Sequence, residues 1–320
     1  MKKKFTSFSD KIKKQQKAVI YELLPPPKEL SRKDLTRSFS LFSKMLHNFP
    51  VDAINIPEVR EETRTGARQG EEIIKLEPRT VCSYLQKHTA IDFIVNRPIV
   101  YQPWKTQKKW FDSVHKKFGV KNVILVGGES SKVTYPGLSV TEAAVKIAQE
   151  YPEVVLGGIT IPTRRDESNR VLQKSLSGVT FFTTQIIYES FFVKKFLKDY
   201  WELCQKKELK PKMIFLSFAP ISNSADLKLL QWLGVGISKE TLEVLTTGWF
   251  GMGWRSLQIC QDILEDILDF VSKQKIRIPL GLNIEHLNRH NLESSFILLE
   301  RLCNIYTVPA FTERRSAVYV

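Results

Sequence analysis

The sequence predicts a single (βα)8 barrel, on the basis of three observations. Eight short segments rich in β-branched and apolar residues alternate with stretches of helical periodicity, as repeated βα units do. The chain has 320 residues, 42% of them hydrophobic, which suits one large α/β domain with a sizeable core. No internal repeat, low-complexity tract or interdomain linker divides it. We therefore expect residues 18–320 to form one barrel, preceded by a basic extension over residues 1–17.

The eight predicted strands follow one another along the whole chain. In order, they cover residues 18–23, 51–56, 90–95, 122–126, 154–160, 180–185, 213–218 and 278–284. Helical periodicity is clearest over residues 139–150 and 256–273, where apolar side chains recur every three or four positions. Such stripes predict helices that pack against the barrel.

Two of the connections have unusual compositions. Residues 58–75 are charged and poor in large apolar side chains, which predicts a loop or an exposed helix above the barrel rim. Residues 249–254 read Trp-Phe-Gly-Met-Gly-Trp, which indicates an aromatic break between two helices. Packing explains this cluster at least as well as stacking on a ligand.

The formal net charge of +14 is spread along the chain and is not gathered into a nucleic-acid-binding motif. The densest basic run is the extension over residues 1–17, which has seven lysines against one aspartate and predicts a frayed or surface helix. A general attraction for phosphate-bearing cofactors or a polyglutamylated substrate is a second use of the charge. The pattern disfavours a nucleic-acid partner.

The composition also bears on location and metal binding. No apolar run reaches the length of a membrane span, and no secretory signal pattern opens the chain, so we expect a cytoplasmic protein without a membrane partner. The four cysteines are Cys82, Cys204, Cys260 and Cys303. They lack metal-ligand spacing, so we expect buried thiols and no metal site.

Glu22 is the most informative single residue. It closes the first predicted strand and is followed at once by two leucines and three prolines. Parallel α/β barrels place their active sites at the carboxyl ends of the strands, where a carboxylate can face the barrel axis. The alternative is a solvated turn residue.

The fourth and fifth predicted strands run into candidate ligand-binding turns. Gly127 and Gly128 allow close backbone approach to a ligand, and Glu129 adds a carboxylate, although such turns are common. Residues 157–165 lead into a helix that carries Glu167, Arg170 and Lys174, and this combination could hold a pyrophosphate. The alternative is an exposed first turn in which Glu167 pairs with Arg170 or Lys174.

The sixth and eighth predicted strands end in polar residues. Gln185 supplies an amide that could bind a heterocycle, or could equally cap the next helix or satisfy the backbone. His286 follows the eighth strand without a serine and acid at triad spacing, which favours a structural role.

Six fragments, taken in order, resemble the methylenetetrahydrofolate reductase family across about Val19 to Leu302. They cover residues 21–26, 122–129, 157–164, 178–185, 219–223 and 287–289. The resemblance implies a (βα)8 barrel that binds FAD and reduces 5,10-methylenetetrahydrofolate to 5-methyltetrahydrofolate with hydride from NADH or NADPH. It also implies a place in one-carbon and methionine metabolism.

The same resemblance implies roles for individual residues. Glu22 falls on the catalytic glutamate, whose protonated carboxyl assists opening of the imidazolidine ring and therefore needs a raised pKa. Gln185 and Glu129 fall on folate contacts. The positions that match contacts to the flavin and its phosphates are Tyr135, Thr163, Arg164, Glu167, Arg170 and Lys174.

Other functions stay open beside this one. A flavin-free or partner-dependent folate reductase would keep the pterin chemistry. A folate-binding accessory protein would hand C1 units or electrons to an electron-transfer or methyltransferase partner without turnover of its own. A homo-oligomer is compatible with each of these functions.

Overall fold

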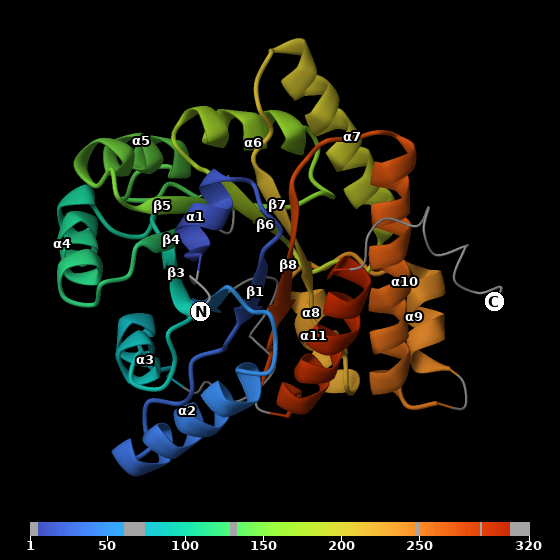
Figure 1. Cartoon of the computed structure of the whole chain (residues 1–320), viewed down its shortest axis with the longest axis horizontal. Helices are drawn as coiled ribbons and strands as arrows, with labels where there is room; N and C mark the ends of the chain where they lie inside the picture. The colour runs from blue at the N-terminus through green and yellow to red at the C-terminus, as the bar shows by residue number, and fades with distance from the viewer. Residues whose placement is uncertain (1–5, 61–73, 129–132, 248–249, 289, 308–320) are drawn as a thin grey trace, which may run out of the picture.

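The computed structural model describes residues 6–60, 74–128, 133–247, 250–288 and 290–307. Eight parallel strands form a closed barrel in which β1 pairs with both β2 and β8, so the predicted (βα)8 barrel is confirmed (Figure 1). The strands are β1 (Val19–Glu22), β2 (Ala53–Ile56), β3 (Asp92–Pro98), β4 (Asn122–Val126), β5 (Val155–Thr160), β6 (Phe181–Thr184), β7 (Met213–Phe218) and β8 (Leu280–Glu285).

Helices surround the barrel and connect the strands in chain order (Figure 1). They are α2 (Arg32–Leu46), α3 (Pro78–Leu85), α4 (Trp104–Lys116), α5 (Val140–Glu150), α6 (Glu167–Leu176), α7 (Ser190–Lys206), α8 (Ser224–Trp232), α9 (Lys239–Thr246), α10 (Met252–Lys273) and α11 (Leu292–Thr307). Helix α5 begins at a capping box, in which Ser139 and Glu142 each bond the other's backbone N–H. The predicted helices over residues 139–150 and 256–273 correspond to α5 and α10.

The largest strand difference is in β3, which extends to Pro98 whereas the prediction ended at residue 95. Asn96, Arg97 and Pro98 have poor strand propensity, but Arg97 pairs with Leu125 and Pro98 with Val126 of β4. Pairing with a neighbouring strand therefore overrides local propensity here.

Helix α1 (Phe8–Lys13) closes the amino-terminal end of the barrel, where Figure 1 shows it lying across the strands. Phe8 and Ile12 are only 1% and 5% exposed, and the Phe8 ring centroid lies 5.4 Å from that of Phe181. The prediction of a frayed or surface helix is wrong for this segment. One apolar face of α1 enters the barrel, while lysines occupy the opposite side.

The barrel interior changes from apolar to polar toward the carboxyl ends of the strands. Phe8 and Ile12 join an inner cluster that includes Ile20, Ala53, Ile94, Phe181 and Phe215. Two residues further along the same strands, side chains of the same face are Glu22, Asn55, Asn96, Thr183 and Ser217. The carboxyl end of the barrel is therefore the candidate location of an active site.

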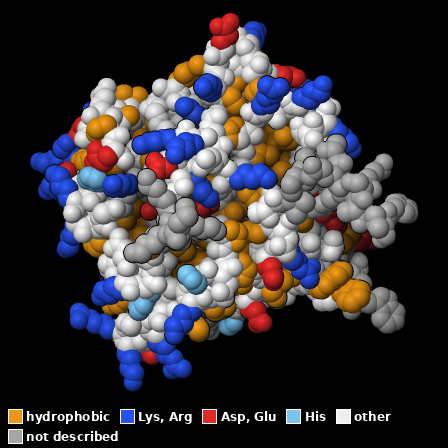
Figure 2. All heavy atoms as spheres, viewed as in Figure 1, with side chains coloured by type: hydrophobic (Ala, Val, Ile, Leu, Met, Phe, Trp, Pro, Cys, Tyr) orange, Lys and Arg blue, Asp and Glu red, His pale blue; other side chains and the backbone are white. Residues whose placement is uncertain are grey.

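The surface and the thiols agree with the composition. Figure 2 shows lysine and arginine side chains scattered over one face of the molecule. All four cysteines are buried and free, as predicted. Within the described ranges, no helix is long and apolar enough to cross a membrane, and no group of three or more histidine, cysteine or acidic residues is placed to hold a metal ion.

The two unusual connections lie partly outside the described residues. Residues 61–73 of the charged segment and Trp249 are outside them. Phe250 precedes α10 and lies against Trp254, with ring centroids 4.8 Å apart. Helix α9 ends at Thr246 and α10 begins at Met252, so the chain does pass from one helix to another here, but Met252, Gly253 and Trp254 belong to α10.

Candidate active site

Two glutamates end neighbouring strands at the carboxyl end of the barrel. Glu22 closes β1, Glu285 closes β8, and the two residues are direct partners in the strand register. Neighbouring strands lie about 4.8 Å apart. Strand alternation directs both side chains into the barrel mouth, where each is half-buried. We call Glu22 and Glu285 the carboxyl pair.

Side-chain amides from β2 and β8 hold the carboxyl pair. Asn55 Nδ2 donates to Glu22 Oε2 at 2.5 Å. Asn283 Nδ2 donates to Glu285 Oε1 at 3.1 Å and to Ser217 Oγ at 2.9 Å. Each carboxyl is therefore positioned by a side chain that is itself fixed on a strand, which favours a preorganised site.

Both carboxyls of the pair hold protons more tightly than ordinary glutamates. Burial raises the pKa of Glu22 to about 7, against the opposing effect of the Asn55 hydrogen bond. Burial and the negative charge of Glu22 raise the pKa of Glu285 well above its usual range. Two ionised carboxylates side by side repel each other, so the pair retains a proton near neutral pH and can act as an acid.

The neighbouring His286 does not extend this acid function. It is 8% exposed, and its backbone N–H donates to the Glu22 carbonyl oxygen at 3.0 Å. Burial lowers the pKa of His286 to about 4, so its ring is neutral at pH 7. A structural role agrees with the prediction for this residue.

Gln185 lies immediately after β6, which β7 and β8 separate from β1 around the barrel. Its Nε2 donates to the Leu233 carbonyl oxygen at 3.0 Å, and its backbone N–H donates to Thr160. The side-chain amide therefore satisfies a backbone group, which was one of the three predicted uses. Its carbonyl oxygen is the remaining polar group for a ligand.

The connection between β5 and α6 is built around two charged side chains. Glu167 is 3% exposed, and its Oε1 accepts from the Ile161 backbone N–H at 3.0 Å. Lys174 Nζ donates to the Ile159 carbonyl oxygen at 2.7 Å, and burial lowers the pKa of Lys174. Both residues thus bind main-chain groups at the end of β5 or just after it, and the alternative of an exposed first turn is wrong for Glu167.

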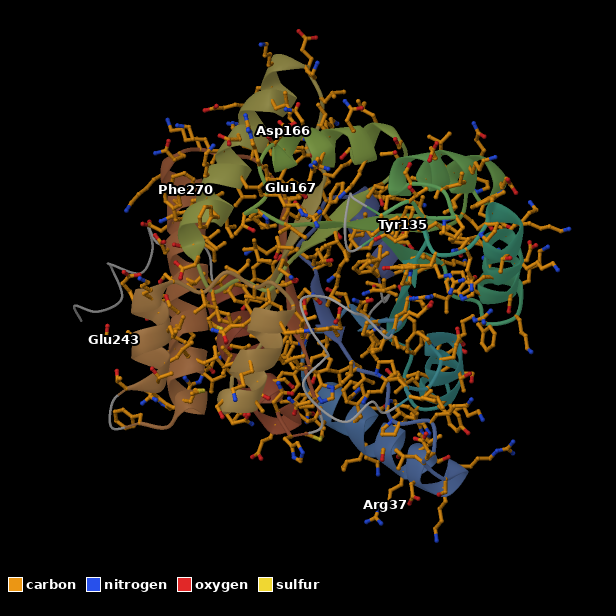
Figure 3. All side chains as sticks on the ribbon, turned by 180° about the vertical axis from the view of Figure 1, so that it is seen from behind. Arg37, Tyr135, Asp166, Glu167, Glu243 and Phe270 are labelled. Atoms are coloured by element: carbon orange, nitrogen blue, oxygen red, sulfur yellow. The ribbon has the colours of Figure 1, made fainter. Side chains whose placement is uncertain are left out.

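The other predicted cofactor contacts in and after this connection are exposed. Thr163, Arg164 and Arg170 all face solvent. Asp166 has a left-handed φ of 61° and lies beside Glu167 where α6 begins (Figure 3). The two guanidinium groups therefore remain accessible to an anionic ligand.

Gly128 and Tyr135 are packed against each other after β4. A Cβ atom on Gly128 would lie 2.3 Å from the Tyr135 ring, so a larger residue at this position would displace the ring. The Tyr135 ring also meets Tyr101 edge to face, with centroids 5.2 Å apart, on the β4 side of the molecule (Figure 3). Glu129 lies outside the described residues.

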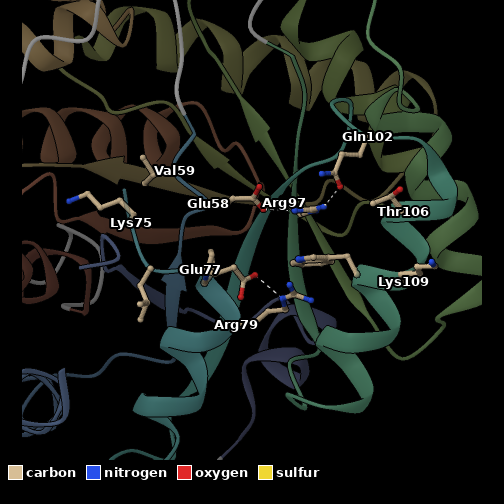
Figure 4. Close-up of a pocket in the computed structure, with 12 residues that line it drawn as sticks. Glu58, Val59, Lys75, Glu77, Arg79, Arg97, Gln102, Thr106 and Lys109 are labelled. Atoms are coloured by element: carbon tan, nitrogen blue, oxygen red, sulfur yellow. Dashed lines mark hydrogen bonds and ion pairs between the residues drawn. The ribbon is translucent and has the colours of Figure 1, made fainter. Parts of the chain in front are cut away.

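A cavity of about 460 Å³ lies next to the ends of β2 and β3 (Figure 4). We call it the Arg97 pocket; its lining includes Glu58, Glu77, Arg79, Arg97, Lys109 and Trp110. Arg97 is buried and bonds Glu58 at 2.6 Å and Gln102 at 2.9 Å. Of these residues, only Glu58 stood out from the sequence, as a polar residue at the end of the second predicted strand.

Asn55 and Glu285 stood out from the sequence as polar residues at the ends of strands, but not as neighbours of Glu22. The predicted eighth strand ended at residue 284, just before Glu285. The two-residue spacing of Asn283 and Glu285 puts both side chains on one face of a strand, and this spacing is the signal for the side on which Glu285 lies. Asn55 occupies the comparable position in β2.

No family model and no curated protein matches the chain. Among solved structures, it resembles an uncharacterised protein from Clostridium thermocellum that binds two copies of 5-methyl-5,6,7,8-tetrahydrofolic acid, with a TM-score of 0.76 and 23% identity. This match covers 93% of the present chain and 99% of the other.

Two further structures share the fold at lower similarity. A β-1,4-mannanase has a TM-score of 0.50 and 11% identity over 89% of this chain and 97% of its own. A long-chain alkane monooxygenase has a TM-score of 0.52 and 10% identity over 92% and 93%. Since these names cover unlike reactions, the comparisons show the barrel fold, and the chemistry has to be argued from the site.

Proposed function

We propose that the chain binds a reduced folate over the barrel mouth and reduces 5,10-methylenetetrahydrofolate to 5-methyltetrahydrofolate, with hydride from NADH or NADPH through FAD. The observation that carries the proposal is the carboxyl pair, because it keeps a proton near neutral pH at the end of the barrel where active sites form. The ligand of the Clostridium thermocellum protein supports it, since 5-methyltetrahydrofolate is the product of this reaction.

The proposed acid is Glu22. Its carboxyl gives a proton to N10 of the folate, the bond between N10 and the methylene carbon breaks, and the resulting N5 iminium accepts a hydride to become an N-methyl group. The carboxylate left on Glu22 is stabilised by the Asn55 amide N–H at 2.5 Å. A pKa of about 7 suits this step, because the acid is protonated in a large fraction of molecules yet gives up its proton readily.

Glu285 has a supporting part in the same proposal. Its carboxyl lies beside that of Glu22, and two negative charges there would repel each other. Glu285 therefore helps to keep Glu22 protonated. Asn283 holds Glu285 in place at 3.1 Å. Gln185 and Glu129 remain the proposed contacts to the pterin. The Nε2 of Gln185 already bonds Leu233, so its side-chain carbonyl oxygen is the proposed contact atom.

FAD fits the exposed residues of the proposed cofactor site better than the buried ones. Arg164 and Arg170 would hold its phosphates, with Thr163 and Tyr135 as further contacts. Glu167 and Lys174 would keep the shape of the connection through their bonds to Ile161 and Ile159. When bound, FAD would carry the hydride from NAD(P)H to the folate.

The test is an absorption spectrum of the purified protein with FAD, followed anaerobically by NADH or NADPH and then by methylenetetrahydrofolate. We expect the flavin band to bleach with the nucleotide and return with the folate. A protein that binds folate but never reoxidises the flavin would contradict the reductase proposal.

A second candidate is a folate-binding accessory protein that passes C1 units or electrons to a partner. It is favoured by one observation: Glu167 and Lys174, two of the six proposed cofactor contacts, already bind the main chain. Such a protein would bind 5-methyltetrahydrofolate by calorimetry and show no turnover with FAD and NAD(P)H unless a partner were added.

A further inference from the structure

We propose that the amino-terminal face of the barrel binds the phosphate backbone of a double-stranded nucleic acid. The face is formed by three connections that lead into β1, β7 and β8, over residues 13–18, 206–212 and 273–279. We call these three connections the basic face. The inference goes beyond the folate reaction and does not depend on it, because the carboxyl pair lies at the opposite end of the barrel.

The basic face holds most of the net positive charge of the chain. Its three connections contain ten lysine and arginine residues and a single acid, Glu208. The five other connections that lead into strands contain four lysines and three acids in total. They cover residues 46–52, 85–91, 116–121, 150–154 and 176–180. The basic face therefore has an excess of nine positive charges, whereas the rest of this end of the barrel has an excess of one.

Barrel closure brings the three connections together, although they are far apart in the sequence. β1 pairs with β8, and β8 pairs with β7. Gln15 Nε2 donates to the Pro211 carbonyl oxygen at 2.9 Å, which joins the first connection to the second. The Ile214 backbone N–H donates to the Pro279 carbonyl oxygen at 2.9 Å, which joins the start of β7 to the third. Figure 2 shows basic side chains on the face that α1 crosses in Figure 1.

The cations of the basic face are accessible to a ligand. Nine of the ten are exposed, and Lys212 is half-buried. Lys273 pairs with Asp269, and Lys17 donates to the Tyr306 carbonyl oxygen. Among the described residues, no acid forms an ion pair with the other seven exposed cations. Their charges are therefore not neutralised within the chain.

Compensation of helix dipoles explains only part of this charge. Helices α1, α7 and α10 end at the basic face, and the negative end of a helix favours a cation in its last turn. This effect accounts for Lys13, Lys206 and Lys273, which are the last residues of these helices. Lys210 and Arg277 lie well beyond the helix ends. Helices α3 and α5 end at the same side of the barrel without a basic residue in the last turn, so the fold does not require one.

The composition of the basic face indicates the kind of polyanion. Nine of its ten cations are lysines, which contact phosphates as point charges and do not read bases. None of the exposed large apolar side chains of the described chain lies in the three connections. The face therefore offers no ring to stack on unpaired bases and no apolar side chain to enter a lipid layer. These properties fit the phosphates of a duplex, and a pI of about 9.5 is typical of proteins that bind them.

The test is the fluorescence anisotropy of labelled DNA and RNA duplexes of one sequence, titrated with the full chain at salt concentrations from about 50 to 200 mM. The face variant loses one exposed cation from each connection, through Lys14→Gln, Lys207→Gln and Arg277→Gln. The control variant loses three exposed lysines at the starts of α2, α4 and α9, through Lys33→Gln, Lys105→Gln and Lys239→Gln. The two variants therefore have the same net charge.

We expect the logarithm of the binding constant to fall linearly with the logarithm of the salt concentration, because each contacted phosphate releases condensed counterions. The face variant should bind on the order of tenfold more weakly, with a salt slope smaller by up to about 3. The control variant should stay within about threefold of the parent, since its charges are distant and screened. Tighter binding of one duplex assigns the source as DNA or RNA.

The proposal is overturned if neither duplex binds, or if the two variants weaken binding equally, which would reflect net charge alone. Vesicles of phosphatidylcholine and phosphatidylserine provide a second comparison. A chain that cosediments with these vesicles and is not released by an excess of duplex would assign the basic face to a lipid surface instead. None of these outcomes bears on Glu22, because the carboxyl pair is unchanged in both variants.

Discussion

The two ends of the barrel are built from the same strands but are chemically opposite. At the amino-terminal end, Phe8 of α1 fills the interior against Phe181 and Phe215. At the carboxyl end, the same faces carry the carboxyl pair and its amides. One end therefore stabilises the fold by excluding water, while the other holds groups whose solvation is incomplete and whose pKa values are shifted. The comparison teaches that fold stability and chemistry are separated along the strand direction.

The strongest test of this separation is Glu22→Gln. Since glutamine cannot donate the proton, we expect folate reduction to fall by about two to four orders of magnitude, while folding and folate binding are retained. The rate of folate reduction is measured by stopped flow, as methylenetetrahydrofolate oxidises the reduced protein under anaerobic conditions. Near-native turnover would mean that Glu22 is not the acid.

The matching change at the opposite end is Phe8→Ala. It removes a ring that is 1% exposed and contacts two other rings, so we expect the free energy of unfolding to fall by about 3–5 kcal/mol. Urea denaturation checks the loss, and folate affinity measured below the transition should stay unchanged. A variant as stable as the parent would show that α1 does not plug the barrel.

The pH dependence of stability sharpens the comparison further. The pKa of Glu22 is about 7 in the folded chain, above the ordinary value of 4.5, so the folded state binds more protons than the unfolded state between these values. The free energy of unfolding should therefore fall as pH rises from about 4.5 to about 7, with a share of about 3 kcal/mol from Glu22.

The control for this prediction is the Glu22→Gln protein. Its free energy of unfolding should change less between pH 4.5 and 7, by about the 3 kcal/mol assigned to Glu22. Glu285 contributes in the same direction, because its pKa is also raised. Parallel stability curves for the parent and Glu22→Gln over pH 4.5–7.5 would contradict the assignment of the raised pKa to Glu22.

The smallest expected effect is that of Gln185→Ala. It removes one neutral amide, which is worth about 0.5–1.5 kcal/mol, so we expect KM for the folate to rise by up to about tenfold. Flavin reduction by NAD(P)H should be largely intact. Equal loss in both half-reactions would instead point to a structural defect at the Leu233 contact.

Local patterns account for most of the fold and for one member of the carboxyl pair. Each predicted strand segment overlaps an observed strand, because β-branched runs bounded by helical periodicity are a local signal. Glu22 was identified because it ends such a run just before three prolines. For Glu129, Tyr135, Thr163, Arg164 and Arg170, the ligand-binding roles stay predictions.

What the sequence by itself determined is therefore the alternation of strands and helices and the polar residues at the strand ends. Only the tertiary structure decided which of these residues meet. Glu285 reaches Glu22 because barrel closure pairs β8 with β1, and Phe8 enters the core because the open end of the barrel accepts an apolar face. The physical reason is that propensity and periodicity act over a few residues, whereas register and burial depend on contacts between distant parts of the chain.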